Sequence, residues 1–209
     1  SDPLHPQFDY LKNTVSVVND HYRAYRNYKV SAEVYDLDMR RIDAQSAVVD
    51  LPEDGVANDV LTLNFAASKT PVQFIKLKLF DESGKQVGDN FYWRSDNEYK
   101  GANTLTGPAT AGFQSLGKLA KTKVAAAYQT SADNTNHYID LRLKNTGRTV
   151  AFFTQVQWLD ERRKPVRPSF YTDNFLCLMP GESRTVRIET ALDKLPGEEY
   201  TLVVRGFNL

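Results

Sequence analysis

Apolar residues alternate with polar ones along much of the chain, and this period of two constrains the fold more than any other feature. Successive side chains of a strand point to opposite faces, so each alternating segment has one face on a core and one in water. This pattern favours antiparallel sheets. The clearest segments are KVSAEVYDL (29–37), FIKLKLFD (74–81), YIDLRLKN (138–145) and RTVRIE (184–189).

The chain also contains an internal repeat. LTLNFAASKTPVQFIKLKLFDESGKQV (61–87) aligns with LRLKNTGRTVAFFTQVQWLDERRKPV (141–166), and an Asp-Asn-Phe triplet follows each copy. The offset of about 80 residues approaches the size of one immunoglobulin-like sandwich. We predict an all-β protein of two tandem immunoglobulin-like antiparallel β-sandwiches, with domains at 1–112 and 113–209. The polar, glycine-rich stretch 95–112 is the predicted linker, and GFQSLGKLAK (112–121) is predicted to form one or two helical turns.

Composition makes several classes of function poor candidates. The 26 Lys and Arg residues balance 26 Asp and Glu residues, whereas proteins that bind nucleic-acid phosphates usually carry a basic excess. No run of 18 apolar residues is present, so we expect no membrane span. The single cysteine, Cys177, excludes an intrachain disulfide. The opening SDPLHPQFDY has neither an initiator methionine nor a signal peptide, so we interpret the chain as a piece of a longer protein.

The sequence offers few candidates for catalytic residues. Adjacent carboxylates on a strand point to opposite faces and cannot easily flank one bond, so the three such pairs are expected in turns or as solvated residues. We expect Cys177 to be a buried, inert thiol. The sequence therefore predicts no catalytic residue, no cofactor and no metal site. The carboxylate pairs are Asp81-Glu82, Asp160-Glu161 and Glu198-Glu199, and the histidines are His5 in the entry segment and His21 and His137 in predicted loops.

Aromatic residues are the better candidates for a contact surface. HYRAYRNY (21–28) interleaves tyrosines with arginines and is predicted to be a loop, and FYWRS (91–95) lies where the first sandwich ends. Exposed Tyr and Trp rings suit either a sugar face or a neighbouring domain. The candidate residues for a sugar or interdomain contact are Tyr22, Tyr25, Tyr92, Trp93 and Tyr171.

The segment FYTDNFLCLMPGES (170–183) is predicted to be a strand that turns a corner. Asp173 and Asn174 tolerate a left-handed backbone and bond their own main chain, so they end one strand and begin the next. Phe175 and the leucines after it would then enter the core. Trp158 stands in mid-strand, where an immunoglobulin-like domain often buries a tryptophan.

The order of motifs in the second half resembles that of the C-terminal immunoglobulin-like domain of family 2 glycoside hydrolases, in particular the exo-β-D-glucosaminidases and their β-mannosidase relatives. The first half resembles the preceding sandwich of these enzymes through Val17-Val18-Asn19 and Val34-Tyr35-Asp36-Leu37. The motifs of the second half are Asn145-Thr146-Gly147, Ala151-Phe152-Phe153, Val166 between Pro165 and Pro168, Tyr171-x-Asp173-Asn174-Phe175 and Leu178-x-Pro180-Gly181-Glu182-Ser183.

The resemblance implies a role without catalysis. The catalytic glutamates of the family lie in a TIM barrel, which needs about 250 residues of its own. The parent would remove terminal β-linked glucosamine, mannose or galactose, and this portion would support its catalytic barrel. The implied partners are that barrel, the N-terminal domains and an oligosaccharide, in a periplasmic or secreted setting. An independent carbohydrate-binding module and a structural or adhesive surface protein are the alternatives.

Overall fold

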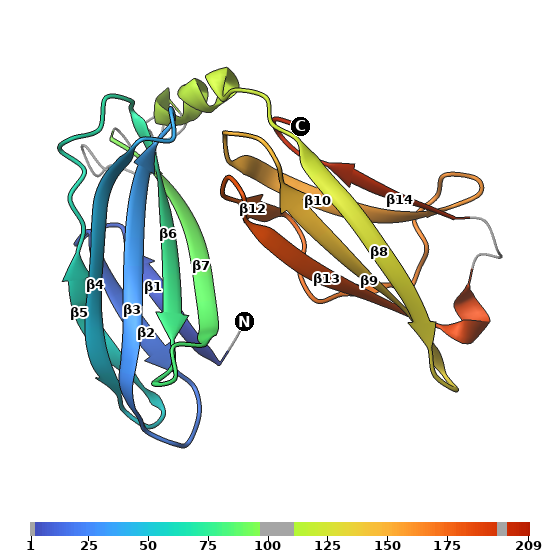
Figure 1. Ribbon diagram of the computed structural model, residues 1–209, viewed down its shortest axis with the longest axis horizontal. Coiled ribbons are helices and arrows are strands. Elements are labelled where there is room, and N and C mark those ends of the chain that lie inside the picture. Colours follow the sequence, from blue (N-terminus) through green and yellow to red (C-terminus); the bar gives the residue numbers. More distant parts are fainter. Residues whose placement is uncertain (1–2, 97–110, 196–199) are drawn as a thin grey trace. The chain divides into compact units, whose positions relative to one another are not determined.

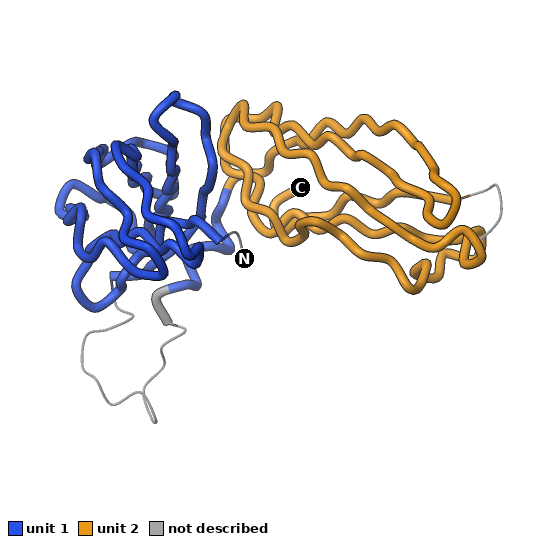
Figure 2. The backbone as a smooth tube through the Cα atoms, turned by 90° about the horizontal axis from the view of Figure 1, so that it is seen from below, with its two compact units in different colours: residues 1–119 blue, residues 120–209 orange. Residues whose placement is uncertain are grey.

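The computed structural model describes residues 3–96, 111–195 and 200–209. The chain divides into two compact units, Ser1–Leu119 and Ala120–Leu209 (Figure 2). Both units are antiparallel and almost entirely β, which confirms the predicted fold class. The division falls later than the predicted boundary at 112, because the helical segment before Leu119 contacts a strand of unit 1. Most of the predicted linker, 95–112, lies outside the described residues.

Unit 1 is a sandwich of two sheets, with strand orders β1-β2-β5 and β4-β3-β6-β7 (Figure 1). The inward side chains of both sheets form its core, including Val15, Val17, Val30, Val34 and Leu77. The predicted helical turns are a 3₁₀ helix, η1 (Ala111–Lys118), which contacts β6. The strands are β1 (Leu4–Asp9), β2 (Thr14–Asn19), β3 (Tyr25–Asp36), β4 (Arg41–Leu51), β5 (Gly55–Thr62), β6 (Val72–Phe80) and β7 (Gln86–Ser95).

Unit 2 is a second sandwich, with strand orders β11-β13-β9-β8 and β12-β10-β14. Trp158 is fully buried in the middle of β10, as predicted, with the ring of Tyr200 5.4 Å away. The elements are β8 (Val124–Ala132), β9 (Asn136–Asn145), β10 (Ala151–Asp160), β11 (Phe170–Tyr171), β12 (Leu176–Leu178), β13 (Ser183–Ala191), the 3₁₀ helix η2 (Leu192–Lys194) and β14 (Tyr200–Arg205).

The two sandwiches share the arrangement of six strands, with β7 additional in unit 1 and β11 additional in unit 2, but in a register that differs from the sequence alignment. In each unit a strand central to one sheet leads directly into a strand central to the other, β2 into β3 and β9 into β10. Asn19 and Asn145 end the first strand of these pairs, and Asp36 and Asp160 end the second. The structural offset is therefore 145 − 19 = 126 residues. The predicted alignment is wrong because it pairs β6 with β10, which occupy different positions.

One turn recurs at the ends of β3, β6 and β10, and it explains why the alignment was misleading. Each turn begins at an aspartate whose Oδ1 accepts the N–H four residues later, from Arg40, Lys85 and Lys164. The third residue after each aspartate is left-handed, with φ of 61° at Met39, 83° at Gly84 and 59° at Arg163. Strands that end in the same turn look alike in sequence even when they occupy different places.

Buried asparagines hold the ends of the strands together. Asn19 is fully buried, and its Nδ2 donates to the carbonyls of Arg23 (2.7 Å) and Pro52 (2.6 Å). Its Oδ1 accepts the N–H of His21 at 3.0 Å. One side chain thus joins the turn after β2 to the segment between β4 and β5.

Asn145 makes the same bonds in unit 2. Its Nδ2 donates to the carbonyls of Thr149 and Leu178, both at 2.8 Å, and its Oδ1 accepts from the N–H of Gly147 and the hydroxyl of Thr122. In both units the amide spans residues i+2 and i+4 of its own turn and one distant carbonyl. We call this arrangement the asparagine clamp.

Asn208 forms a further clamp near the end of unit 2. Its Nδ2 donates to the carbonyls of Ala120 and Val150, and its Oδ1 accepts the N–H of Phe152 at 3.0 Å. Asn208 therefore links the C-terminal end of unit 2 to Ala120, which precedes β8, and to the start of β10. Like the other two, it is almost fully buried.

We expect Asn145→Ala to lower the free energy of unfolding of unit 2 by about 3 kcal/mol, because it leaves the buried carbonyls of Thr149 and Leu178 and the part-buried N–H of Gly147 without their partner. Asn134→Ala is the matched control, since Asn134 is exposed in a turn. Chemical denaturation followed by circular dichroism measures both. Equal stability of the two variants would show that the clamp contributes nothing.

Candidate functional site

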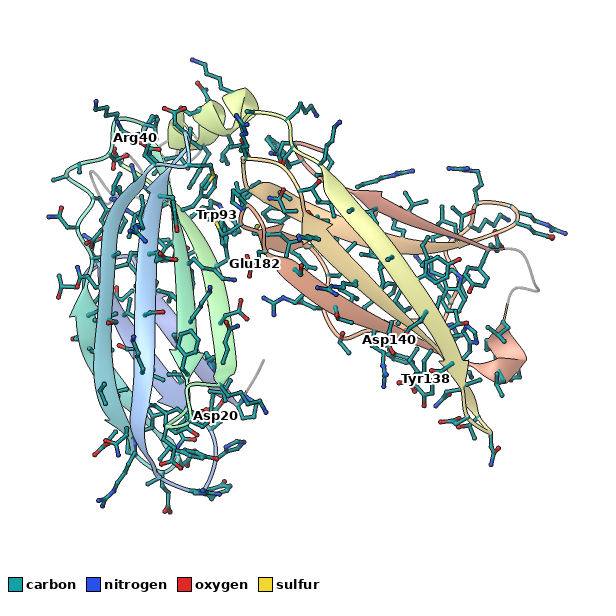
Figure 3. All side chains as sticks on the ribbon, in the orientation of Figure 1. Asp20, Arg40, Trp93, Tyr138, Asp140 and Glu182 are labelled. Atoms are coloured by element: carbon teal, nitrogen blue, oxygen red, sulfur yellow. The ribbon has the colours of Figure 1, made fainter. Side chains whose placement is uncertain are left out.

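Tyr92 and Trp93 are neighbours in β7 and point to opposite faces of the sheet. Tyr92 faces Ile75 across the β6–β7 pair and packs on the core, with its ring 6.0 Å from those of Phe8 and Tyr10. Burial raises the pKa of the Tyr92 hydroxyl above its usual value. Trp93 faces Phe74 on the outer side of the sheet. The two residues therefore cannot form one contact surface, and the half-buried Trp93 is the candidate on the outer face. Figure 3 labels Trp93.

The tyrosine–arginine segment is only partly a loop. The predicted loop 21–28 is wrong for its second half, because β3 begins at Tyr25 and pairs with β4. Tyr25 bonds the Nδ1 of His21 at 2.6 Å and lies under the guanidinium of Arg23 at 5.0 Å. Tyr22, by contrast, is 85% exposed. Within this segment only Tyr22 presents most of its ring to a potential ligand.

The corner at 170–178 is real, but its strained residue is not the one predicted. Asn174 donates from Nδ2 to the carbonyl of Val156 and accepts its N–H, so the amide takes the place of a strand partner for β10. The left-handed residue is Phe175, with φ of 57°, rather than Asp173 or Asn174. Phe175 was predicted to be core and is 54% exposed. The positive φ turns this side chain outward, and Leu176 and Leu178 enter the core.

Tyr171 is part of the interior of unit 2. Its hydroxyl accepts the backbone N–H of Trp158 at 3.1 Å, and burial raises its pKa. The ring packs against the core cluster that contains Trp158. A sugar contact by Tyr171 stays a prediction, and the hydrogen bond supports a structural role.

The titratable residues that the sequence analysis considered lie in separate elements of the described part of the chain. His5 and His137 lie in β1 and β9, so the loop placement of His137 was wrong. Cys177 is partly exposed in β12 and not buried as predicted. Among residues 3–96, 111–195 and 200–209, no group of three His, Cys, Asp or Glu could hold a metal ion. Asp81-Glu82 and Asp160-Glu161 lie at turns as predicted, and Glu198-Glu199 lies outside the described residues.

A polar pocket of about 760 Å³ in unit 1 was missed by the sequence analysis. The segment between β5 and β6 forms one wall, and the guanidinium of Arg94 lies 4.1 Å from the ring centre of Phe65. Arg94 also donates to Gln73 at 3.1 Å. The Nε of Arg94 and the Oδ1 of Asn13 are buried and make no hydrogen bond among the described residues. A pocket that joins segments far apart in sequence leaves no local signal that could have predicted it.

Taken together, the described residues form a tandem of β-sandwiches with candidate contact surfaces at Tyr22, at Trp93 and at the pocket beside Arg94. No helix in the described residues is long and apolar enough to cross a lipid bilayer. The class that the fold defines is a tandem of immunoglobulin-like β-sandwich domains.

Comparison with known proteins identifies the family. Residues 103–209 match the model of the exo-β-D-glucosaminidase Ig-fold domain, and the chain belongs to this family. The match confirms the resemblance to family 2 glycoside hydrolases. The exo-β-D-glucosaminidase of Streptomyces avermitilis is 29% identical over the whole of this chain, which covers 24% of that protein. The chain therefore spans about a quarter of the length of the curated relatives that it matches.

Solved structures agree with this assignment. The crystal structure of the Amycolatopsis orientalis exo-chitosanase CsxA matches with a TM-score of 0.87 and 26% identity, over 99% of this chain and 26% of that one. The β-D-mannosidase of Dictyoglomus thermophilum matches with a TM-score of 0.65 over 99% of this chain and 22% of that one. Its 14% identity supports the fold alone.

The opposite placements of Tyr92 and Tyr22 give a direct test. We expect Tyr92→Ala to lower the free energy of unfolding of unit 1 by about 3 kcal/mol, because it empties a site in the aromatic core. Tyr22→Ala should change it by less than about 0.5 kcal/mol, because the ring is exposed. Denaturant unfolding curves of the two variants provide the measurement. A large loss in Tyr22→Ala would mean that this ring is structural rather than available for contact.

Proposed function

We propose that the chain is the noncatalytic C-terminal β-sandwich portion of an exo-β-D-glucosaminidase and that it supports the catalytic barrel of that enzyme. The observation that carries this proposal is the continuous match of both units, in one order and over the whole chain, to a single segment of exo-β-D-glucosaminidases. A repeated surface protein or a free binding module would not need both sandwiches in this order.

Glucosamine is the terminal sugar that the comparisons favour for the parent enzyme. The relatives that match by sequence are named exo-β-D-glucosaminidases, and the mannosidase is similar only in fold. Mannose and galactose are the alternative substrates. The periplasmic or secreted setting stays a prediction.

An oligosaccharide contact is a second candidate function, and the pocket beside Arg94 favours it. Polar side chains line the pocket together with the apolar Leu63 and Phe65, and they include Gln45, Asn64, Ser68 and Asp96. Sugar hydroxyls both donate and accept hydrogen bonds, and sugar rings offer apolar faces. The exposed ring of Tyr22 is a separate candidate surface on the same unit.

The proposed activity is tested with the whole protein that contains this chain. We expect it to hydrolyse an aryl β-D-glucosaminide with kcat/KM at least about tenfold above that for the matching β-mannoside and β-galactoside, and we expect the 209-residue chain alone to hydrolyse none of them. Turnover by the isolated chain would contradict its noncatalytic role. A preference for the mannoside would identify the parent enzyme as a mannosidase instead.

The supporting role is tested by Trp93→Ala in the same whole protein. If the outer face of β7 contacts another domain, the variant should lose several degrees in melting temperature or several-fold in kcat, because a large aromatic contact is removed. Leu11→Ala is the control for loss of an exposed apolar side chain, since Leu11 is 81% exposed. An unchanged melting temperature together with unchanged turnover in Trp93→Ala would remove Trp93 from the proposed contact.

A further inference from the structure

Strand β8 is the edge strand of the β11-β13-β9-β8 sheet, and almost all of its side chains are exposed. It pairs with β9 along its whole length, in one uninterrupted register from Val124 to Ala132 (Figure 1). Every residue from Ala125 to Ala132 is exposed, and Tyr128 is 57% exposed. In the part of the chain that the structure describes, no strand pairs with the outer edge of β8. Such an edge presents a row of backbone donors and acceptors that can pair with another strand.

The other sheet edges of this protein carry features that block such pairing. Proteins protect edges with short strands, charges, prolines and bulges. Strand β8, VAAAYQTSA, has nine residues, no charge, no proline and no register shift. The protective features elsewhere are Pro6 in β1, three charged residues in β4, the irregular pairing and the left-handed Asp59 of β5, the shifted register of β7, the two- and three-residue lengths of β11 and β12, and Arg205 in β14.

The sequence of β8 is suited to pairing with itself. In an antiparallel pair centred on Tyr128, this residue faces the partner's Tyr128, and Val124 faces the partner's Ala132. No like charges meet inside the pair, because β8 contains no charged residue. Opposed aromatic residues at the centre stabilise such a pair.

Charges of opposite sign meet at both ends of the same register. Lys123 directly precedes β8 and Asp133 directly follows it, so Lys123 faces the partner's Asp133 twice across the twofold axis. Both residues are exposed. The Asp133 carboxylate accepts the N–H groups of Thr135 (2.7 Å) and Asn136 (2.8 Å) and the Tyr138 hydroxyl (2.7 Å). These bonds hold the pKa of Asp133 far below its usual range, so the carboxylate is anionic at neutral pH.

We propose that β8 is a docking edge for a second copy of this chain, in which two β8 strands pair antiparallel about a twofold axis through Tyr128. The pairing joins the two β11-β13-β9-β8 sheets into one continuous sheet. Because the contact is isologous, it closes on itself and yields a dimer rather than a filament. This inference rests on unit 2 alone and is independent of the proposed glycosidase function.

Sedimentation velocity of the 209-residue chain, from about 5 to about 500 µM, tests the association. The dimer fraction should rise with concentration. Tyr128→Lys should weaken association at least about tenfold, because it opposes two like charges on the axis. Val48→Lys is the matched control, since Val48 is 67% exposed on the edge strand β4. A wild-type chain that stays monomeric over the whole range, or equal weakening by both variants, would overturn the proposal.

Disulfide cross-linking tests the register in a Cys177→Ser background. Tyr128→Cys should form a covalent dimer under mild oxidation, because the two cysteines would face each other within the range that a disulfide spans. Ala125→Cys should not, because the two copies would lie about 20 Å apart along the strands. Circular dichroism of each variant checks that the fold is retained. Equal cross-linking at both positions, or none at Tyr128→Cys, would overturn the proposed pairing.

Discussion

The sandwiches depend on buried asparagine amides that close the ends of their strands. A strand that leaves one sheet for the other must break its ladder, and the freed backbone groups need partners once they are buried. Asn19 and Asn145 supply those partners at the same place in the two units, each with one side chain that both donates and accepts. Asn208 does so where the chain ends. Hydrophobic packing can then proceed on both inner faces while these backbone groups keep hydrogen-bond partners.

The aromatic residues also divide into a structural set and an exposed set. Tyr92 and Tyr171 lie against the cores, and their rings or hydroxyls are used within their own units. Tyr22 and Phe175 are exposed, and at Phe175 a left-handed backbone turns the ring outward. A bulky residue at positive φ is uncommon and is retained only where the surrounding structure imposes it. Here the Asn174 amide, which replaces a strand partner for Val156, imposes it.

Family membership and fold together identify this chain as immunoglobulin-like domains of the exo-β-D-glucosaminidase type. The described residues offer turn carboxylates and dispersed histidines, and the pocket beside Arg94 is lined by one cation and one carboxylate. Surfaces of this kind are suited to contact with a neighbouring domain. The uncharged edge of β8 is different in kind, because backbone groups rather than side chains would make the contact.

The sequence by itself determined the fold class, the tandem arrangement and the family, because alternation, turn residues and motif order are local properties. Trp158 in mid-strand was predicted for the same reason. Only the tertiary structure decided which strands are equivalent, because strands that end in the same aspartate turn look alike until their neighbours are known. It also decided that Tyr92 is core while Trp93 lies on the outer face, that Phe175 is exposed, and that Arg94 and Asn13 line one pocket. Each of these depends on contacts between residues far apart in the chain, which local patterns do not encode.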